Sequence, residues 1–207
     1  MNKVRRIRAW FVDSGITSIT PEIDMRYIRF LNATLILFGF GQIPILALLI
    51  SLGLWAPLQV NLAALAICAL GFVINRHGFH LPAKIVIVSV VIANTAYFAL
   101  VLGSVAPAHL WLIPVAVLGT LAFKPSEWIW ATTLVGLSVI MFLIFEIIHS
   151  EITPVVQIFR NPLDELRSAK ASTVFAMVLT LILVGMMHRR FAISERALSH
   201  EKSQSDR

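Results

Sequence analysis

The chain has 207 residues, of which 58% are hydrophobic and 14% are charged, and its mean hydropathy is +0.84. A water-soluble domain of this size needs more charge on its surface, so the composition excludes a soluble globular protein and predicts an integral membrane protein. The formal net charge of +6 does not indicate a nucleic-acid partner, because the Lys and Arg residues flank apolar segments instead of alternating with aromatic residues.

The first predicted element is an amphipathic cytoplasmic helix within residues 1–25, lying in the plane of the membrane. Its apolar side chains recur at near-helical spacing, with basic side chains on or beside the opposite face. The apolar residues are Val4, Ile7, Trp10, Phe11 and Ile16, and the basic ones are Arg5, Arg6 and Arg8. The alternative is a disordered basic tail that only sets topology. A cleaved signal peptide is excluded, because Asp13 and Asp24 interrupt any apolar core.

Six apolar segments within residues 26–188 are predicted to cross the bilayer as helices, which need roughly 17 to 25 apolar residues each. They run over about 27–54, 58–74, 79–102, 108–123, 128–148 and 171–187. Pro44 predicts a kink in the first segment, and Pro114 interrupts the short fourth one. Lys124-Pro125-Ser126-Glu127 predicts a turn followed by a helix start. The sequence therefore predicts an all-α, multi-pass bundle of six transmembrane helices.

The distribution of positive charge predicts that both termini are cytoplasmic. With the N-terminus inside, fourteen Lys and Arg residues fall on the inside and three on the outside. The three outside are Arg160, Arg167 and Lys170, all in the longest loop, residues 149–170. A five-span chain would place Arg189 and Arg190 on the wrong side of the membrane.

Residues 189–207 contain no Gly or Pro, so the sixth helix is predicted to continue into the cytoplasm as a signalling helix. Phe191, Leu198 and Ser205 are spaced seven apart, which predicts a seam for a parallel homodimer. The alternative is a solvated helix end whose wet face carries Glu195 and Lys202.

The charged helix from Glu195 to Arg207 resembles the junction in membrane-bound class III nucleotide cyclases, where the last membrane helix continues towards the catalytic domain. Asn75-Arg76-His77-Gly78 and the helix start through Lys84 look like the second cytoplasmic-side loop of six-helix anchors. Such anchors are attached to adenylate and guanylate cyclases, diguanylate cyclases and histidine kinases. The resemblance implies a dimeric sensor of the inner (plasma) membrane that regulates a cytoplasmic cyclase output domain following residue 207.

The signal that such a sensor would read is left open among a lipid, a quinone, a diffusible apolar molecule and a redox species. Two other functions remain as alternatives. One is a purely structural dimerising anchor, and the other is a small transporter or channel.

No catalytic motif is present in the sequence. A cyclase site needs paired Asp residues to hold metal, yet no Asp occurs between Asp24 and Asp164. The sequence also lacks a phosphate-binding P-loop, a Gly-x-Ser-x-Gly elbow and a His-Glu-x-x-His helix. A single cysteine, Cys68, excludes an internal disulfide framework. Residues 1–207 are therefore expected to have no enzymatic activity of their own.

Five histidines are candidate ligands of membrane-bound haem b. His109 and His149 are predicted near the outer interface, and His77, His80 and His188 near the inner one. Two imidazoles from different helices at one depth can supply both axial ligands of haem iron. The predicted pairs are His109 with His149, and His188 with His77 or His80, with no other metal expected. The alternative is that interfacial histidines cap helix ends and contact lipid headgroups.

Two further residues are candidate ligand contacts. Glu146, one turn before His149, is predicted to bind a ligand, to pair with His149, or to extend to water. Asn94, in the third span, is a candidate ligand residue, but both Asn94 and Thr95 are expected more often to form interhelical hydrogen bonds.

Overall fold

The computed structural model describes residues 11–17, 20–103, 107–148, 151–153, 170, 173–174 and 176–185. Every regular element within these residues is a helix, which confirms the predicted all-α fold class. Residues 1–10, which hold the first part of the predicted amphipathic helix, lie outside the described residues. So do 189–207, with the predicted signalling helix and dimer seam.

Four helices are long and apolar enough to cross a membrane, which is typical of a membrane protein. They are α2 (Glu22–Ser51), α3 (Trp55–Arg76), α4 (His80–Leu102) and α6 (Trp128–Ile148). These correspond to the first, second, third and fifth predicted segments. Helix α2 begins five residues before the predicted start. The prediction followed the apolar run, and the first turn of the helix is polar. Pro44 lies inside this helix.

The fourth predicted segment is a composite of two shorter pieces. A 3-10 turn η2 (Ala108–Trp111) leads into α5 (Leu112–Ala122), which is shorter than a full span. Of the sixth predicted segment, Ala176–Gly185 is described and helical. The turn and helix start predicted at residues 124–127 are present as η3 (Pro125–Glu127), which leads directly into α6.

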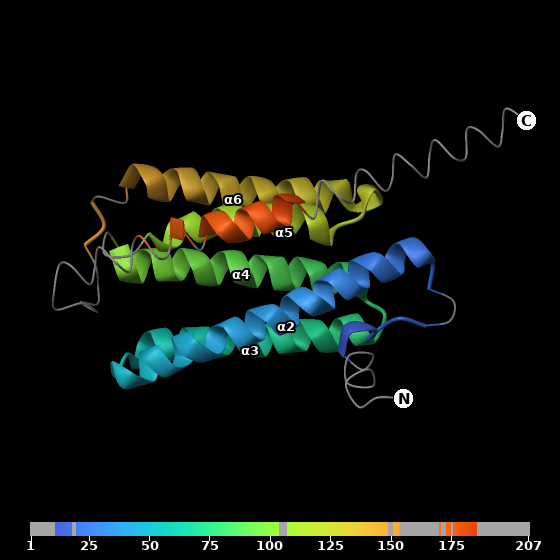
Figure 1. Cartoon of the computed structure of the whole chain (residues 1–207), viewed down its shortest axis with the longest axis horizontal. Helices are drawn as coiled ribbons and strands as arrows, with labels where there is room; N and C mark the ends of the chain where they lie inside the picture. Colours follow the sequence, from blue (N-terminus) through green and yellow to red (C-terminus); the bar gives the residue numbers. More distant parts are fainter. Residues whose placement is uncertain are drawn as a thin grey trace, which may run out of the picture.

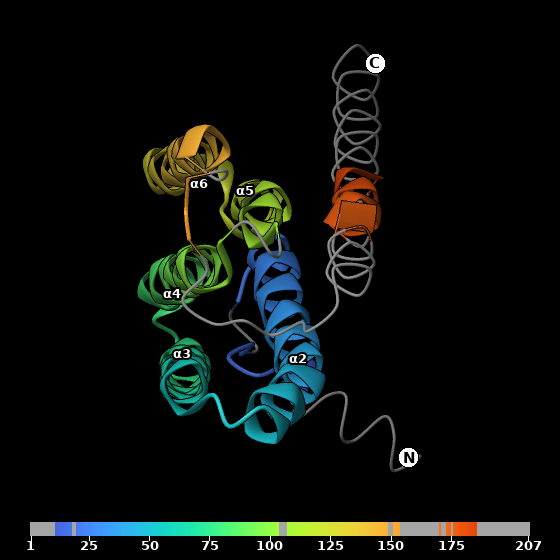
Figure 2. The same ribbon diagram turned by 90° about the vertical axis from the view of Figure 1, so that its left-hand side faces the viewer.

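Helix α4 lies between α3 on one side and α5 and α6 on the other, as Figures 1 and 2 show. Helix α2 crosses obliquely and contacts both α3 and α5. The main apolar core is formed by α4 with η2, α5 and α6. Its buried members include Val88, Ile92, Leu112, Leu134 and Phe145.

Small residues allow α3 to approach α4 closely. Ala64, Cys68, Gly71 and Asn75 are buried at helical spacing along α3, the pattern that lets membrane helices pack backbone to backbone. At Gly71 a Cβ atom would lie only 2.7 Å from Cγ1 of Ile87 on α4. A larger residue at this crossing would therefore force Ile87 or the helix itself to shift.

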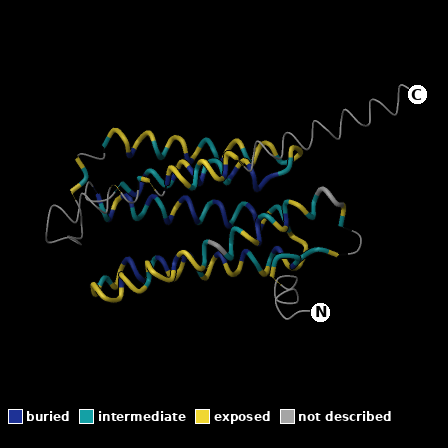
Figure 3. Tube along the Cα trace, viewed as in Figure 1, coloured by how far each residue is buried: buried dark blue, intermediate teal, exposed yellow. Residues whose placement is uncertain are grey.

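Figure 3 shows exposed positions along the outside of the helices, and many of the exposed residues are large and hydrophobic. Large hydrophobic side chains such as Phe40, Leu70, Ile140 and Ile147 are exposed on α2, α3 and α6, whereas several Asn side chains are buried. An apolar exterior around a partly polar interior suits a lipid environment, where contact with the acyl chains carries no penalty.

Candidate functional site

An ion pair is buried at one end of the bundle, between α4 and the start of α6. Lys84 Nζ donates to Glu127 Oε2 over 2.7 Å, and the two side chains are 1% and 10% exposed. The same Glu127 oxygen accepts the backbone N–H of Lys124 over 3.0 Å. Glu127 therefore both caps the η3 turn and neutralises a lysine that the helix packing has removed from water.

A second ion pair extends this cluster to α2. Lys124 Nζ lies 3.1 Å from the Asp24 carboxylate, and both side chains are partly exposed. The rings of Tyr27 and Phe123 lie 5.2 and 5.8 Å from Lys84 Nζ, within the range of cation–π contacts. We call the residues Asp24, Lys84, Lys124 and Glu127 the charged end of the bundle.

The segment before α2 is fixed to the same end by a chain of hydrogen bonds. Asn32 Nδ2 donates to the backbone oxygens of Val12 and Ser14, over 3.1 and 2.9 Å, and Asn75 Nδ2 donates to Asn32 Oδ1 over 2.8 Å. His80 Nδ1 lies 2.7 Å from Asn75 Oδ1. Because an amide oxygen only accepts, Nδ1 of His80 carries the proton.

Halfway along the bundle, neutral polar side chains join three helices. Asn61 Nδ2 of α3 donates to Gln42 Oε1 of α2 over 3.0 Å, and Asn94 Nδ2 of α4 reaches Asn61 Oδ1 at 3.5 Å. The expected interhelical bond of Asn94 is thus present. Thr95 behaves differently, because its hydroxyl donates to Val91 O within α4. Oδ1 of Asn94 and Oγ of Ser138 are buried and have no hydrogen-bond partner in the part of the chain that the structure describes.

His109 and Glu146 form a pair at the opposite end of the bundle. His109 Nε2 lies 3.0 Å from Glu146 Oε2; the histidine side chain is 4% exposed and the glutamate 58%. The 3-10 turn η2 sets His109 inward, against Phe142 of α6, with ring centroids 6.1 Å apart. Of the roles predicted for Glu146, the structure shows pairing with a histidine, but that histidine is His109.

The predicted haem ligands are only partly described. His149 and His188 lie outside the described residues, so the pairs predicted with them stay predictions. His109 lies at the far end and His80 at the charged end, while His77 is exposed just after α3. The proton on Nδ1 of His80 leaves its Nε2 as the nitrogen that can bind a metal. In His109, by contrast, Nε2 already contacts Glu146. Ligation of iron through that nitrogen would require the contact with Glu146 to be exchanged.

Within the described ranges, no group of three or more His, Cys, Asp or Glu side chains is arranged to hold a metal ion. A haem with two axial histidines does not depend on such a group.

The charged end was missed as a site by sequence reasoning, which assigned Lys84 and Lys124 only to topology. The available signal was the position of Lys84, one turn inside an apolar helix and distant from any sequence neighbour of opposite charge. An ionisable residue in such a place needs a partner from elsewhere in the fold.

Comparisons with protein-family models, with curated proteins and with solved structures gave no match to this chain. Its function is therefore argued from the charged end, the polar interior and the His109–Glu146 pair.

Proposed function

We propose that this chain is a membrane sensor and regulatory anchor. In this proposal it is a six-helix bundle of the plasma (inner) membrane with both termini in the cytoplasm. It forms a homodimer through residues 189–207 and passes a signal through that helix to a cytoplasmic nucleotide cyclase domain. The fourteen-to-three bias of basic residues and the resemblance of Glu195 to Arg207 to cyclase junctions support it.

The observation that carries the proposal is the buried Lys84–Glu127 ion pair. It joins α4 to the start of α6, and the neighbouring Lys124–Asp24 pair adds the start of α2. With the N-terminus inside, this end lies at the cytoplasmic face, where the sixth helix is predicted to leave the membrane. Separating a buried pair leaves an uncompensated charge and costs about 3 to 5 kcal/mol. Because of this cost, the helices that the pair joins favour two discrete arrangements, with the pair formed or broken, over a continuous range of positions. A signalling element requires such discrete states.

The interior of the bundle argues against transport. Away from the two ends of the bundle, the polar side chains of helices α2 to α6 are neutral, such as Gln42, Asn61 and Asn94. Ion and proton pathways usually place ionisable residues or unwound helices near the midplane. Transport of a substrate by the purified protein in proteoliposomes would favour the alternative of a small transporter or channel.

The proposal includes haem b as one candidate cofactor, through which the chain would sense redox state. His80 and His109 would each supply one axial ligand, with the second ligands drawn from His188 and His149. Bound haem would provide one-electron chemistry, and the chain's own contribution would be to hold the imidazole rings at two depths.

The test is to join a class III cyclase catalytic domain to Arg207 and to measure cAMP formation in membranes. Lys124→Met should change basal output several-fold, because it removes the contact between α2 and η3 at little loss of stability. Arg29→Met is the matched control, since Arg29 pairs with Asp13 on the surface, outside the charged end. Unchanged output in Lys124→Met, together with full regulation after replacement by an unrelated dimeric anchor, would favour a purely structural anchor.

A further inference from the structure

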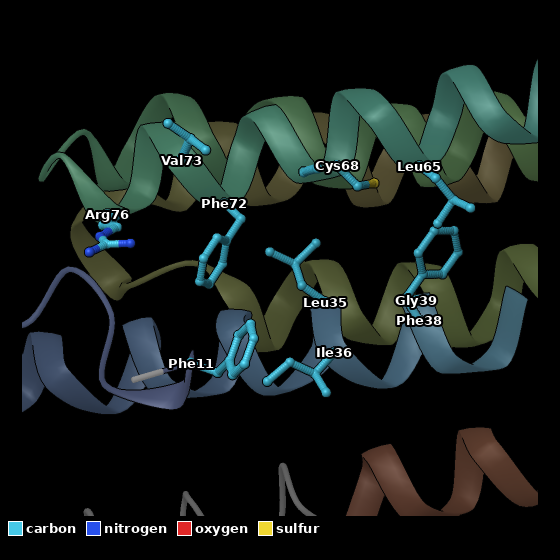
Figure 4. A pocket seen from close by; sticks show the side chains of 11 residues that line it. Phe11, Leu35, Ile36, Phe38, Gly39, Leu65, Cys68, Phe72, Val73 and Arg76 are labelled. Carbon is cyan, nitrogen blue, oxygen red and sulfur yellow. The ribbon is translucent and has the colours of Figure 1, made fainter. Parts of the chain in front are cut away.

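A groove of about 540 Å³ runs between α2 and α3, partly open on one side (Figure 4). Leu35 and Gly39 line it from α2, and Leu65, Cys68 and Phe72 line it from α3. From Leu65 to Arg76 the α3 wall is about 16 Å long at 1.5 Å per residue. A volume of this size lies within the range of about 300 to 1,000 Å³ that is typical of small-molecule sites.

The groove is apolar along its length and positively charged at one end. Among the described residues that line it, Arg76 carries the charge, at the last residue of α3. Phe11, from the segment before α2, lies over the same end, and its ring centroid is 6.3 Å from that of Phe72 (Figure 4). An occupant must therefore match a long apolar wall and place an anionic group near Arg76.

We propose that this groove binds a single-chain anionic amphiphile, a long-chain fatty acid, with its acyl chain between α2 and α3 and its carboxylate at Arg76. One apolar wall that ends at one basic residue suits one acyl chain with one anionic group, and a two-chain phospholipid is the competing occupant that the test below distinguishes. The proposal deepens the proposed function by naming a ligand class, and it rests on that function only for the signalling consequence. Binding itself is measured without an output domain.

Gly39 lines the groove at a position where a side chain can start without a clash. A Cβ atom built on Gly39 would meet no atom within 4 Å, so a larger side chain enters open space. Gly41 is the matched control, since it lies in the same helix, also has open space at its Cβ, and does not line the groove. Both substitutions replace a helical glycine by a better helix former.

The experiment uses the purified full chain in phosphatidylcholine nanodiscs, with palmitic acid carrying a diazirine on its chain as the photoprobe. We expect saturable labelling that maps to the groove walls in α2 and α3. Gly39→Leu should weaken the apparent affinity about tenfold, and Gly41→Leu should leave it unchanged. Arg76→Gln should weaken binding of the acid but not of the corresponding alcohol probe, while Arg26→Gln, on a residue outside the groove, should affect neither.

Equal labelling of the wild type, Gly39→Leu and Gly41→Leu would overturn the site, as would crosslinks that map elsewhere. Loss of labelling on adding phosphatidylglycerol, but not on adding unlabelled palmitate, would identify a bilayer phospholipid as the occupant and overturn the single-chain assignment. If palmitate binds as expected but does not change the output of the joined cyclase domain, the site stands and the fatty acid is excluded as the signal; the proposed function itself is decided by Lys124→Met and by replacement of the anchor.

Discussion

Lys84 and Glu127 lie 43 residues apart in the sequence, yet the Lys84 ammonium donates to the Glu127 carboxylate over 2.7 Å inside the bundle. The pair is enclosed by the aromatic rings of Tyr27 and Phe123. Its position joins α4 to the beginning of α6, where Glu127 also accepts the N–H of Lys124. One carboxylate thus connects a local turn to the packing of distant helices.

Replacing Lys84 by Met should destabilise the protein by roughly 3 kcal/mol, because Glu127 would keep a buried charge without its partner. Thermal unfolding in detergent measures the loss. Lys124→Met should cost less than about 1 kcal/mol, since the Lys124–Asp24 pair is partly exposed. Equal stability of Lys84→Met and the wild type would contradict the burial of this pair, and Lys84→Met combined with Glu127→Gln should recover part of the lost stability.

Gly15→Ala should detach the segment before α2 from the end of α3. Gly15 has a φ of +86°, and a Cβ there would lie 2.5 Å from the backbone oxygen of Asn75. Gly78 has a similar φ of +89° but open space around its Cβ, so Gly78→Ala tests backbone strain alone, about 1 to 2 kcal/mol. A larger drop in melting temperature for Gly15→Ala than for Gly78→Ala is expected, and equal drops would rule out the close contact.

Gly71→Ala should push α3 away from α4 and destabilise the bundle by about 1 to 3 kcal/mol through overpacking against Ile87. Gly136, on α6, has open space at its Cβ, so Gly136→Ala serves as the control and should be neutral or mildly stabilising. The double substitution Gly71→Ala with Ile87→Ala should lose less stability than the sum of the two single changes. Simple additivity would show that the two residues do not touch.

The haem branch predicts a Soret band in protein purified from cells supplied with haem. Replacing His109 and His149 by Ala, together with His188, should abolish the band, because both predicted layers would lose a ligand. Glu146→Gln should retain it, and should ease ligation by His109 by weakening the contact with its Nε2. A colourless preparation, or an unchanged band in the triple variant, would exclude this assignment.

The predicted dimer seam is tested by disulfide crosslinking of single cysteines in membranes. In a Cys68→Ala background, cysteine at Leu198 or Ser205 should crosslink two chains, because equivalent seam residues of the two helices face each other in a parallel coiled coil. Cysteine at Arg196, two residues from the seam position, is the control and should crosslink poorly. Absence of crosslinking at both seam positions would contradict a parallel seam.

The sequence by itself determined that the chain is all-α and rich in helices apolar enough to cross a membrane, because hydropathy and helix length are local properties. It also located the helix start at Lys124 to Glu127, where turn-forming residues act within a few positions. The polar first turn of α2 was missed, because a search for apolar runs does not see it.

Only the tertiary structure decided which polar side chains meet. Sequence spacing gave no reason to join Lys84 to Glu127, Asn32 to Asn75, or His109 to Glu146, because each pair lies on different helices. The same holds for the groove between α2 and α3, whose shape depends on the oblique crossing of the two helices. Contacts between helices depend on rotation and depth in the bundle, and these are fixed by close packing at residues such as Gly71, which apolar content does not encode.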